Sequence, residues 1–130
     1  MSDSPREVAQ RLLAWIIEKR WTELPDLYAE DTVVAQPFSP GSTVLRGRAQ
    51  LAEHFGGAAG MPLRMAARNV VVHETADPEV VVMEYDYDVE VTTTGQAFTV
   101  PNILVIRVRD GRIVASRDYH DHHVMRAALS

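Results

Sequence analysis

Acidic and imidazole side chains gather near the C-terminal end of the chain, in the run Asp118-Tyr119-His120-Asp121-His122-His123. A carboxylate and an imidazole two residues apart share one face of an extended strand, and both groups can move protons. We therefore take Asp118 and His120 as candidate catalytic residues. The alternative for His120 is a histidine at the mouth of a pocket, without a chemical role.

The same run also raises the question of a metal site, because Asp118, His120 and His122 could share a strand face. Their spacing matches no established zinc signature, and short histidine clusters near a terminus are usually solvated. We expect no metal ion here. The chain has no cysteine, which excludes disulfides and thiolate chemistry. No glycine loop of the phosphate-binding kind is present, so no cofactor is implied.

Strict alternation marks residues 79–92 as a strand with two different faces. One face carries four carboxylates, Glu84, Asp86, Asp88 and Glu90. Burying four unpaired carboxylates would be very costly, so this face must meet water. Tyr85 and Tyr87 then point inward, either as core aromatics with satisfied hydroxyls or as part of a site.

Residues 96–109 form the next predicted strand, with Arg107 and Arg109 on its outer side. Asn102 is the single polar residue of the inward row. A buried amide needs hydrogen-bond partners, so Asn102 is either a structural bridge or a member of a site.

The orientation of Asp118 depends on the turn at Asp110-Gly111. A tight two-residue turn would put Ile103 opposite Asp118 and face Asp118 outward. A bulge at the glycine would shift the register by one and put Asn102 opposite Asp118. We favour the bulge, because the first register turns Arg117 inward. A two-residue turn at Thr94-Gly95 would then complete a polar row of Tyr87, Asn102 and Asp118.

Helices come first in this chain and strands follow. Ser4-Pro5-Arg6-Glu7 has the form of a capping box at the start of a helix. A second, short helix starts near Thr22, and a third covers Arg48 to Phe55 and stops at Gly56-Gly57. Four strands are predicted at 64–74, 79–92, 96–109 and 112–120. Residues 1–130 thus read as one α+β domain, an antiparallel sheet with helices on one side.

Three segments carry a resemblance to a known family: Leu27-Tyr28-Ala29-Glu30-Asp31-Thr32, Leu45-Arg46-Gly47, and the C-terminal stretch from Asp110 to Asp121. They resemble the SnoaL-like, ketosteroid-isomerase-like family of the nuclear transport factor 2-like superfamily. The resemblance implies a curved, mostly antiparallel sheet wrapped as a cone around a cavity, with three N-terminal helices on the concave side. It also implies a hydrophobic small-molecule ligand and a homodimer.

A local similarity to limonene epoxide hydrolase places the catalytic aspartate of that enzyme on Asp118. Its arginine and second aspartate fall on Tyr85 and Tyr87, and its water-holding residues on Val34 and Gln36. The base of ketosteroid isomerases also falls on Gln36. The resemblance therefore favours the polyketide cyclases, which rely on one acid–base aspartate in an apolar cavity.

We predict an acid–base enzyme of the polyketide cyclase or isomerase kind, acting on a hydrophobic oxygenated molecule. Asp118 would move the proton and His120 would assist. The predicted substrate-binding residues are Tyr85, Tyr87, Asn102, Gln36 and Trp15. The rival hypothesis is a non-catalytic ligand-binding or dimerisation module of the same fold; an open cavity would favour the enzyme, and a cavity filled by side chains would favour the module.

Charge and hydropathy limit the partners of this chain. The net charge is -5 and the pI about 5.5, so no basic field would attract nucleic acid. No apolar segment is long enough to cross a bilayer, and the N-terminal residues lack a signal pattern, so we expect a cytoplasmic protein. A homodimer would use the outer sheet face, where Thr99, Ile103 and Val105 supply apolar surface.

Overall fold

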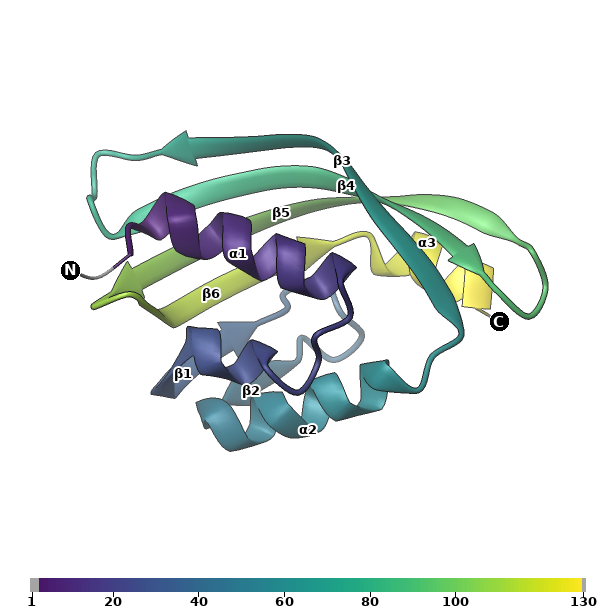
Figure 1. The fold of residues 1–130 in the computed structure, drawn as a ribbon, viewed down its shortest axis with the longest axis horizontal. Coiled ribbons are helices and arrows are strands. Elements are labelled where there is room, and N and C mark those ends of the chain that lie inside the picture. Colours follow the sequence, from purple (N-terminus) through teal and green to yellow (C-terminus); the bar gives the residue numbers. More distant parts are fainter. Residues whose placement is uncertain (1–2, 130) are drawn as a thin grey trace.

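Six strands form one curved sheet in the order β2-β1-β6-β5-β4-β3 (Figure 1). The computed structural model describes residues 3–129. Its elements, in chain order, are α1 (Pro5–Ile17), the 3₁₀ turn η1 (Leu24–Leu27), β1 (Tyr28–Ala35), β2 (Val44–Arg46), α2 (Gly47–Ala59), β3 (Leu63–Glu74), β4 (Val80–Val91), β5 (Ala97–Arg109), β6 (Arg112–His120) and α3 (His122–Leu129).

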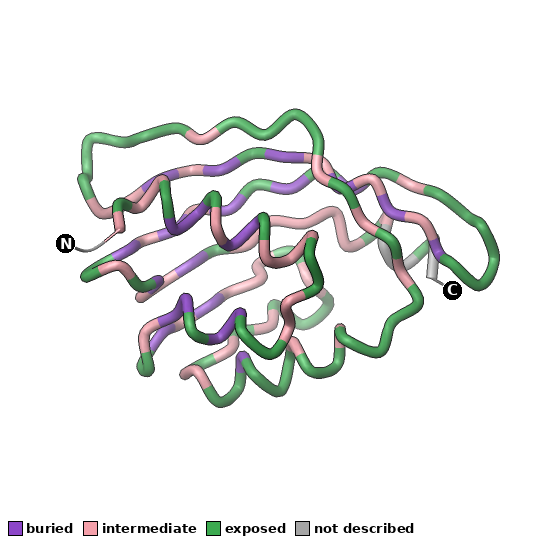
Figure 2. Tube along the Cα trace, in the orientation of Figure 1, coloured by how far each residue is buried: buried purple, intermediate pink, exposed green. Residues whose placement is uncertain are grey.

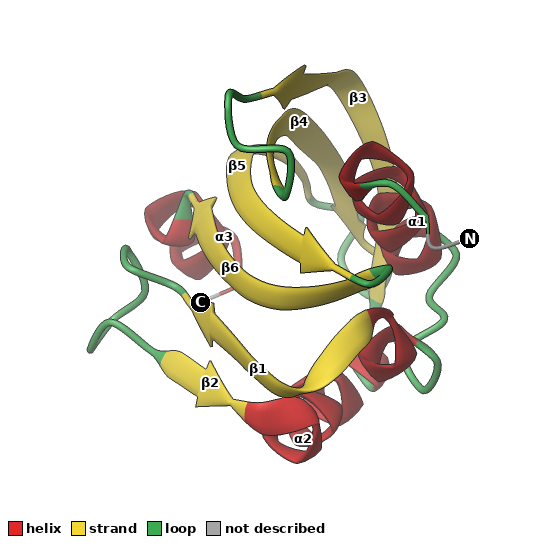
Figure 3. Cartoon of the chain, turned by 90° about the vertical axis from the view of Figure 1, so that its left-hand side faces the viewer, coloured by secondary structure: helices red, strands yellow, loops and turns green. Residues whose placement is uncertain are grey.

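Neighbouring strands are antiparallel except β1 and β6, which run parallel. The sheet is open, with β2 and β3 as its edges. In Figure 3 it curls around α1 and α2, which lie on its concave side. The predicted α+β class, the mostly antiparallel curved sheet and the helices on the concave side are confirmed.

Helix α1 begins where the sequence predicts. The Ser4 hydroxyl accepts a hydrogen bond from the Glu7 backbone N–H, and the Glu7 carboxylate accepts one from the Ser4 N–H. Pro5 stands at the first helical position, where its missing N–H costs little. Val8 and Leu12 lie one turn apart and are buried against the sheet, so this face of α1 closes the core.

Helix α2 is longer than predicted. It runs from Gly47 to Ala59 and passes through Gly56 and Gly57, which were expected to end it. Both glycines are exposed, and a Cβ at either position would meet no atom within 4 Å. Glycine in the interior of a helix costs only a modest amount of backbone entropy, so the helix continues through this pair.

The four predicted strands are present, with no end displaced by more than one residue, and burial alternates along β4 and β5. Figure 2 shows this alternation as buried and exposed stretches that follow one another along the middle strands. The short strands β1 and β2 and the C-terminal helix α3 were not predicted. The second predicted helix is the single turn η1, and Tyr28 beyond it already belongs to β1.

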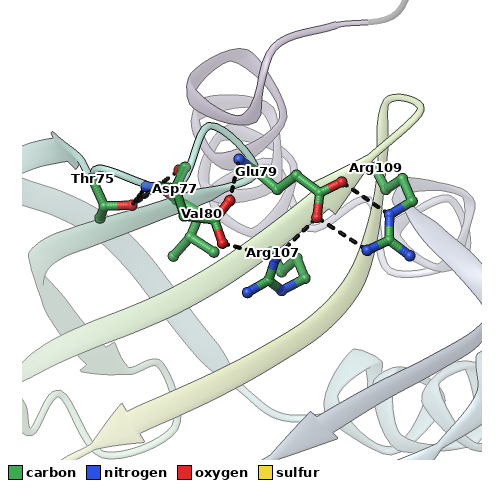
Figure 4. Close-up of polar contacts among 6 residues, drawn as sticks. All are labelled: Thr75, Asp77, Glu79, Val80, Arg107 and Arg109. Atoms are coloured by element: carbon green, nitrogen blue, oxygen red, sulfur yellow. Dashed lines mark hydrogen bonds and ion pairs between the residues drawn. The ribbon is translucent and has the colours of Figure 1, made fainter.

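The acidic face of β4 meets water, as expected, but it is only partly exposed and its carboxylates are paired. Across the outer face, β3 supplies a partner to each carboxylate: Arg64 to Glu90, Arg68 to Asp88, Asn69 to Asp86 and His73 to Glu84. At the end of the same face, Figure 4 shows the Glu79 carboxylate between Arg107 and Arg109. Hydrogen bonds from Arg109 and Arg107 lower the pKa of Glu79 to about 2.

The β5–β6 register differs from the predicted one. Asp110 and Gly111 both have positive φ, 52° and 75°, and form the tight two-residue turn that was rejected, with Arg109 opposite Arg112. The register then shifts at Val114, inside β6, because Val108 pairs with Ile113 and Arg107 with Ala115.

The extra residue at Val114 is a bulge that turns the rest of β6 over. Asp118 consequently pairs with Leu104 on the inner face, while Arg117 is exposed on the outer face. The inward orientation of Asp118 is therefore confirmed, but the bulge at Gly111 and the pairing with Asn102 are wrong.

The turn between β4 and β5 is also longer than predicted. Residues 92–95 form a four-residue loop, closed by the Val91 N–H bonding to the Gln96 carbonyl. Because the loop has two more residues than predicted, the β4–β5 pairing shifts by two positions, and every side chain stays on its predicted face of the sheet. Asn102 therefore lies beside Tyr85, and Tyr87 lies beside Val100. The actual polar row is Tyr85, Asn102 and His120.

Candidate functional site

A cavity of about 420 Å³ lies between the concave face of the sheet and the helices. Its wall is mostly apolar and is rich in aromatic rings, contributed by Trp21, Tyr28, Phe55, Tyr85, Tyr87 and Phe98. This volume falls within the range of small-molecule pockets, about 300–1,000 Å³. The side chains thus leave room for a ligand.

Asp118 borders this cavity from the middle of the sheet. Asp118 is half-buried, and it lines the cavity with the surface that remains accessible. Burial raises the pKa of Asp118 to about 6, and a hydrogen bond donated by the Ser116 hydroxyl works in the opposite direction. A carboxyl group with this pKa takes up and gives back a proton near neutral pH.

Three tyrosines surround the same part of the cavity. The Tyr85 hydroxyl donates to the Tyr87 oxygen at 3.1 Å, and the two rings meet edge to face. Burial raises the pKa of all three hydroxyls, and the charge of Asp118 raises them further. Among the described residues the Tyr28 and Tyr87 hydroxyls donate to no protein atom, so both can donate to a ligand.

His120 lies two residues beyond Asp118 on the same face of β6. Its Nδ1 is 2.6 Å from the Oδ1 of Asn102, whose Nδ2 donates to the Val100 carbonyl. Burial, together with smaller contributions from His122 and His54, lowers the pKa of His120 to about 4. The imidazole is therefore neutral at physiological pH.

The rest of the C-terminal run serves other purposes. Asp121 caps α3, since its carboxylate accepts a hydrogen bond from the Val124 N–H. The His122 ring meets that of His120 edge to face, and His123 is exposed. Among residues 3–129, no three histidine or acidic side chains converge in a way that could hold a metal ion.

The predicted site residues divide into two groups. Asp118, His120, Tyr85, Tyr87 and Gln36 all line the cavity. Trp15 does not border it; its ring packs against the core, under the Arg20 guanidinium at 4.1 Å. Asn102 borders a second hollow instead, and its two amide atoms bond within the protein.

The cavity is also lined by residues that were assigned no role in the sequence analysis. Tyr28 starts β1 and is buried beside the cavity. Trp21 borders the cavity in place of Trp15. His54 is exposed overall but borders the cavity, and partial burial lowers its pKa. Its position one helical turn after the buried Leu51 was the available signal.

The second hollow is a shallower groove of about 590 Å³ near the start of α3. Phe38, Ile103 and Tyr119 supply its apolar part, and the Phe38 and Tyr119 rings meet edge to face at 5.1 Å. Phe38 is 68% exposed and Ile103 is 42% exposed. Exposed apolar side chains grouped in this way are typical of a surface that binds a partner. No helix among the described residues has both the length and the apolar character needed to span a membrane.

A curved sheet, helices on its concave side and an apolar cavity with a few polar groups define a class of small ligand-binding α+β proteins. The sequence profile of the SnoaL-like domain matches residues 9–116, and the chain belongs to this family.

Solved structures of similar proteins agree with this assignment. A candidate isomerase from Bacillus subtilis has 28% sequence identity, with a TM-score of 0.86 over 95% of this chain and 90% of that one. A candidate polyketide cyclase from Xanthomonas campestris pv. campestris has 22% identity and a TM-score of 0.81, over 97% and 96%.

A third solved structure holds a small ligand. It is a hypothetical protein from Catenulispora acidiphila with a ketosteroid isomerase-like fold, in complex with trimethylamine. It has 18% identity and a TM-score of 0.77, over 94% of this chain and 91% of that one. At 22% and 18% identity, the second and third similarities concern the fold alone.

Proposed function

We propose that this protein is an acid–base enzyme of the cyclase or isomerase kind, which needs no cofactor and acts on a hydrophobic oxygenated molecule. The observation that carries the proposal is Asp118: it borders an open, aromatic cavity, and burial raises its pKa to about 6. A poorly hydrated carboxyl group of this kind suits proton transfer at neutral pH.

The tyrosine hydroxyls offer hydrogen-bond donors to an oxygen atom of the substrate. The Tyr85 hydroxyl donates a hydrogen bond to the Tyr87 oxygen, which leaves the Tyr87 O–H free to donate to a ligand carbonyl. Asp118 would take a proton from the carbon next to that carbonyl, while the Tyr87 and Tyr28 hydroxyls stabilise the charge that develops on the oxygen. The proton then returns to another carbon, or the carbanion attacks a second carbonyl carbon of the same molecule, whose π electrons move to its oxygen and take up the proton, so that a ring closes. Gln36 would help to orient the same oxygen.

Two rival functions are less well supported. Epoxide opening by an aspartate–arginine–aspartate relay finds Tyr85 and Tyr87 at the positions of its second and third members. A non-catalytic binding module would be favoured by a cavity filled with side chains, whereas this one has about 420 Å³ of free volume.

The test is hydrogen–deuterium exchange at carbon, followed by NMR in D₂O, with enolisable two-ring ketones such as 2-tetralone and 2-decalone. The wild-type protein should accelerate the exchange, and Asp118→Asn should lower the rate about 10²–10⁴-fold, as is typical for a lost acid–base group. Asp86→Asn, on the outer face, is the matched control and should leave the rate unchanged. Binding of these ketones without any exchange would favour the binding module. Normal exchange by Asp118→Asn would reduce Asp118 to a binding group.

We also propose a homodimer formed through the outer face of the sheet. Ile103, Tyr119 and Phe38 supply apolar surface there, and the paired charges of β3 and β4 would form a polar rim. Light scattering at micromolar concentration should report twice the monomer mass. Ile103→Asp should shift the protein toward monomer, and a monomeric wild-type protein would refute the proposal.

A further inference from the structure

His120 has two ring nitrogens, and the hydrogen bond made by one decides which role is left for the other. Nδ1 lies 2.6 Å from the side-chain oxygen of Asn102, a hydrogen-bonding distance. Nε2 has no hydrogen-bond partner among residues 3–129, and it is not one of the fully buried polar atoms. A ligand or water can therefore reach Nε2.

The orientation of the Asn102 amide follows from its other partner. The Val100 carbonyl oxygen can only accept a hydrogen bond, so the group 2.9 Å away from it must be the Asn102 NH₂. The Asn102 oxygen then faces His120. Because that oxygen also only accepts, the proton between the two residues belongs to His120 Nδ1.

Asn102 is held firmly enough to impose this choice. It is 3% exposed and lies on β5, between Tyr85 on β4 and His120 on β6. None of these three strands is an edge of the sheet. Turning the amide over would put the Asn102 oxygen against the Val100 carbonyl oxygen and leave the buried Asn102 oxygen without a donor. Each unsatisfied buried group costs about 1–3 kcal/mol.

We propose that Asn102 is a positioning residue that holds His120 in the Nδ1–H tautomer, so that Nε2 is the proton-accepting atom offered to the ligand, as a second acid–base group beside Asp118. In this arrangement Asp118 takes the proton from the carbon next to the carbonyl, and Nε2 accepts a second proton from the ligand and returns it in a later step. The imidazolium that forms keeps its Nδ1–H bond to Asn102. This proposal deepens the proposed function and rests on it for the use of the proton acceptor.

The electrostatic surroundings of His120 are consistent with this role. His122 on α3 and His54 on α2 face the imidazole and, together with burial, lower its pKa. Asp118 and Asp121 flank it on its own strand and at the start of α3. Near pH 6 the imidazole of His120 is neutral and the carboxyl group of Asp118 is partly ionised, so the cavity holds two groups that can accept a proton.

The tautomer can be measured without any substrate, from long-range ¹H–¹⁵N correlations of the histidine rings at pH 7.5. In the wild-type protein, His120 should show a protonated Nδ1 and an unprotonated Nε2. Asn102→Ala should lower the ratio of the Nδ1–H to the Nε2–H form about tenfold, equivalent to ~1.4 kcal/mol, close to the contribution of one hydrogen bond. His73, on the opposite face, serves as the internal control and should not change.

Asn102→Asp keeps an acceptor opposite Nδ1, so it should retain the Nδ1–H form and raise the pKa of His120. This variant and the wild-type spectrum decide the matter if Asn102→Ala does not fold. A wild-type His120 in the Nε2–H form, or a ratio unchanged by Asn102→Ala, would overturn the proposal. Either result would leave the exchange experiment on Asp118 unaffected, so the two proposals fail separately.

Discussion

Replacing Asp118 by asparagine should change how stability depends on pH, and this can be tested without a substrate. Burial raises the pKa of Asp118 from the ordinary 3.8 to about 6 in the folded protein. A carboxyl group with a higher pKa in the folded form favours folding most below pH 3.8. That contribution is lost as the pH rises through 6, because ionisation then costs more in the folded chain than in the unfolded one.

The size of the effect follows from the two pKa values. One pKa unit corresponds to about 1.36 kcal/mol, so ionised Asp118 destabilises the folded protein by up to about 3 kcal/mol above pH 7. Roughly 2 kcal/mol of this difference should develop between pH 4 and pH 7.5. Asp118→Asn keeps the acceptor for the Ser116 hydroxyl but cannot ionise. It should gain stability over the wild-type protein by that amount across this interval.

Urea unfolding at four pH values between 4 and 7.5 measures the difference. Asp88→Asn is the matched control, because a hydrogen bond from Arg68 lowers the pKa of Asp88 and reverses the sign. That variant should lose stability relative to the wild-type protein as the pH rises. Parallel curves for wild type and Asp118→Asn would show that Asp118 is well hydrated, and the argument for its raised pKa would fail.

Three further outcomes are expected. Ser4→Ala should lower the free energy of unfolding by about 1 kcal/mol, the usual cost of a lost helix cap, and an unchanged urea midpoint would mean that the cap does not contribute. Ser116→Ala removes the hydrogen bond to Asp118 and should raise the pKa of that carboxyl above about 6, as followed by ¹³C NMR titration; a lower pKa would contradict this. Gly111→Ala should cost about 1–2 kcal/mol in urea unfolding because Gly111 has a φ of 75°, whereas equal stability would place the strain elsewhere.

The long strands could be predicted because their signals are local. Alternation along β4 and β5 and the turn residues between strands specify both the strands and their faces. Strands β1 and β2 lack such signals. Part of β1 is exposed, at Glu30 and Asp31, and its parallel partner β6 begins about eighty residues later. Nothing in a local window indicates that pairing.

The contacts within the candidate site could not be fully predicted, because they depend on the registers of the β4–β5 and β5–β6 strand pairs. Two-residue and bulged turns at Asp110-Gly111 differ by one position, and the sequence contains no sign of the bulge at Val114. The predicted orientation of Asp118 is correct because Arg117 had to face water, which is a constraint on burial rather than on the turn. Asn102 was identified as a buried amide in need of partners, but those partners lie on another strand and depend on both registers.

The parallel pairing of β1 with β6 constrains the order in which the protein can assemble. Strand β1 leaves the ribosome well before β6, and its pairing with β6 can be completed only when residue 117 has been made. Until then Tyr28 and Val34, both buried in the finished protein, lack their neighbour β6, and among residues 3–129 the other strand beside β1 is β2, which pairs with Val34 but not with Tyr28. Contacts that join such distant parts of a chain slow folding. A nascent chain released before β6 would therefore expose one wall of the cavity, and that incomplete form is where we expect chaperone binding and aggregation to be concentrated.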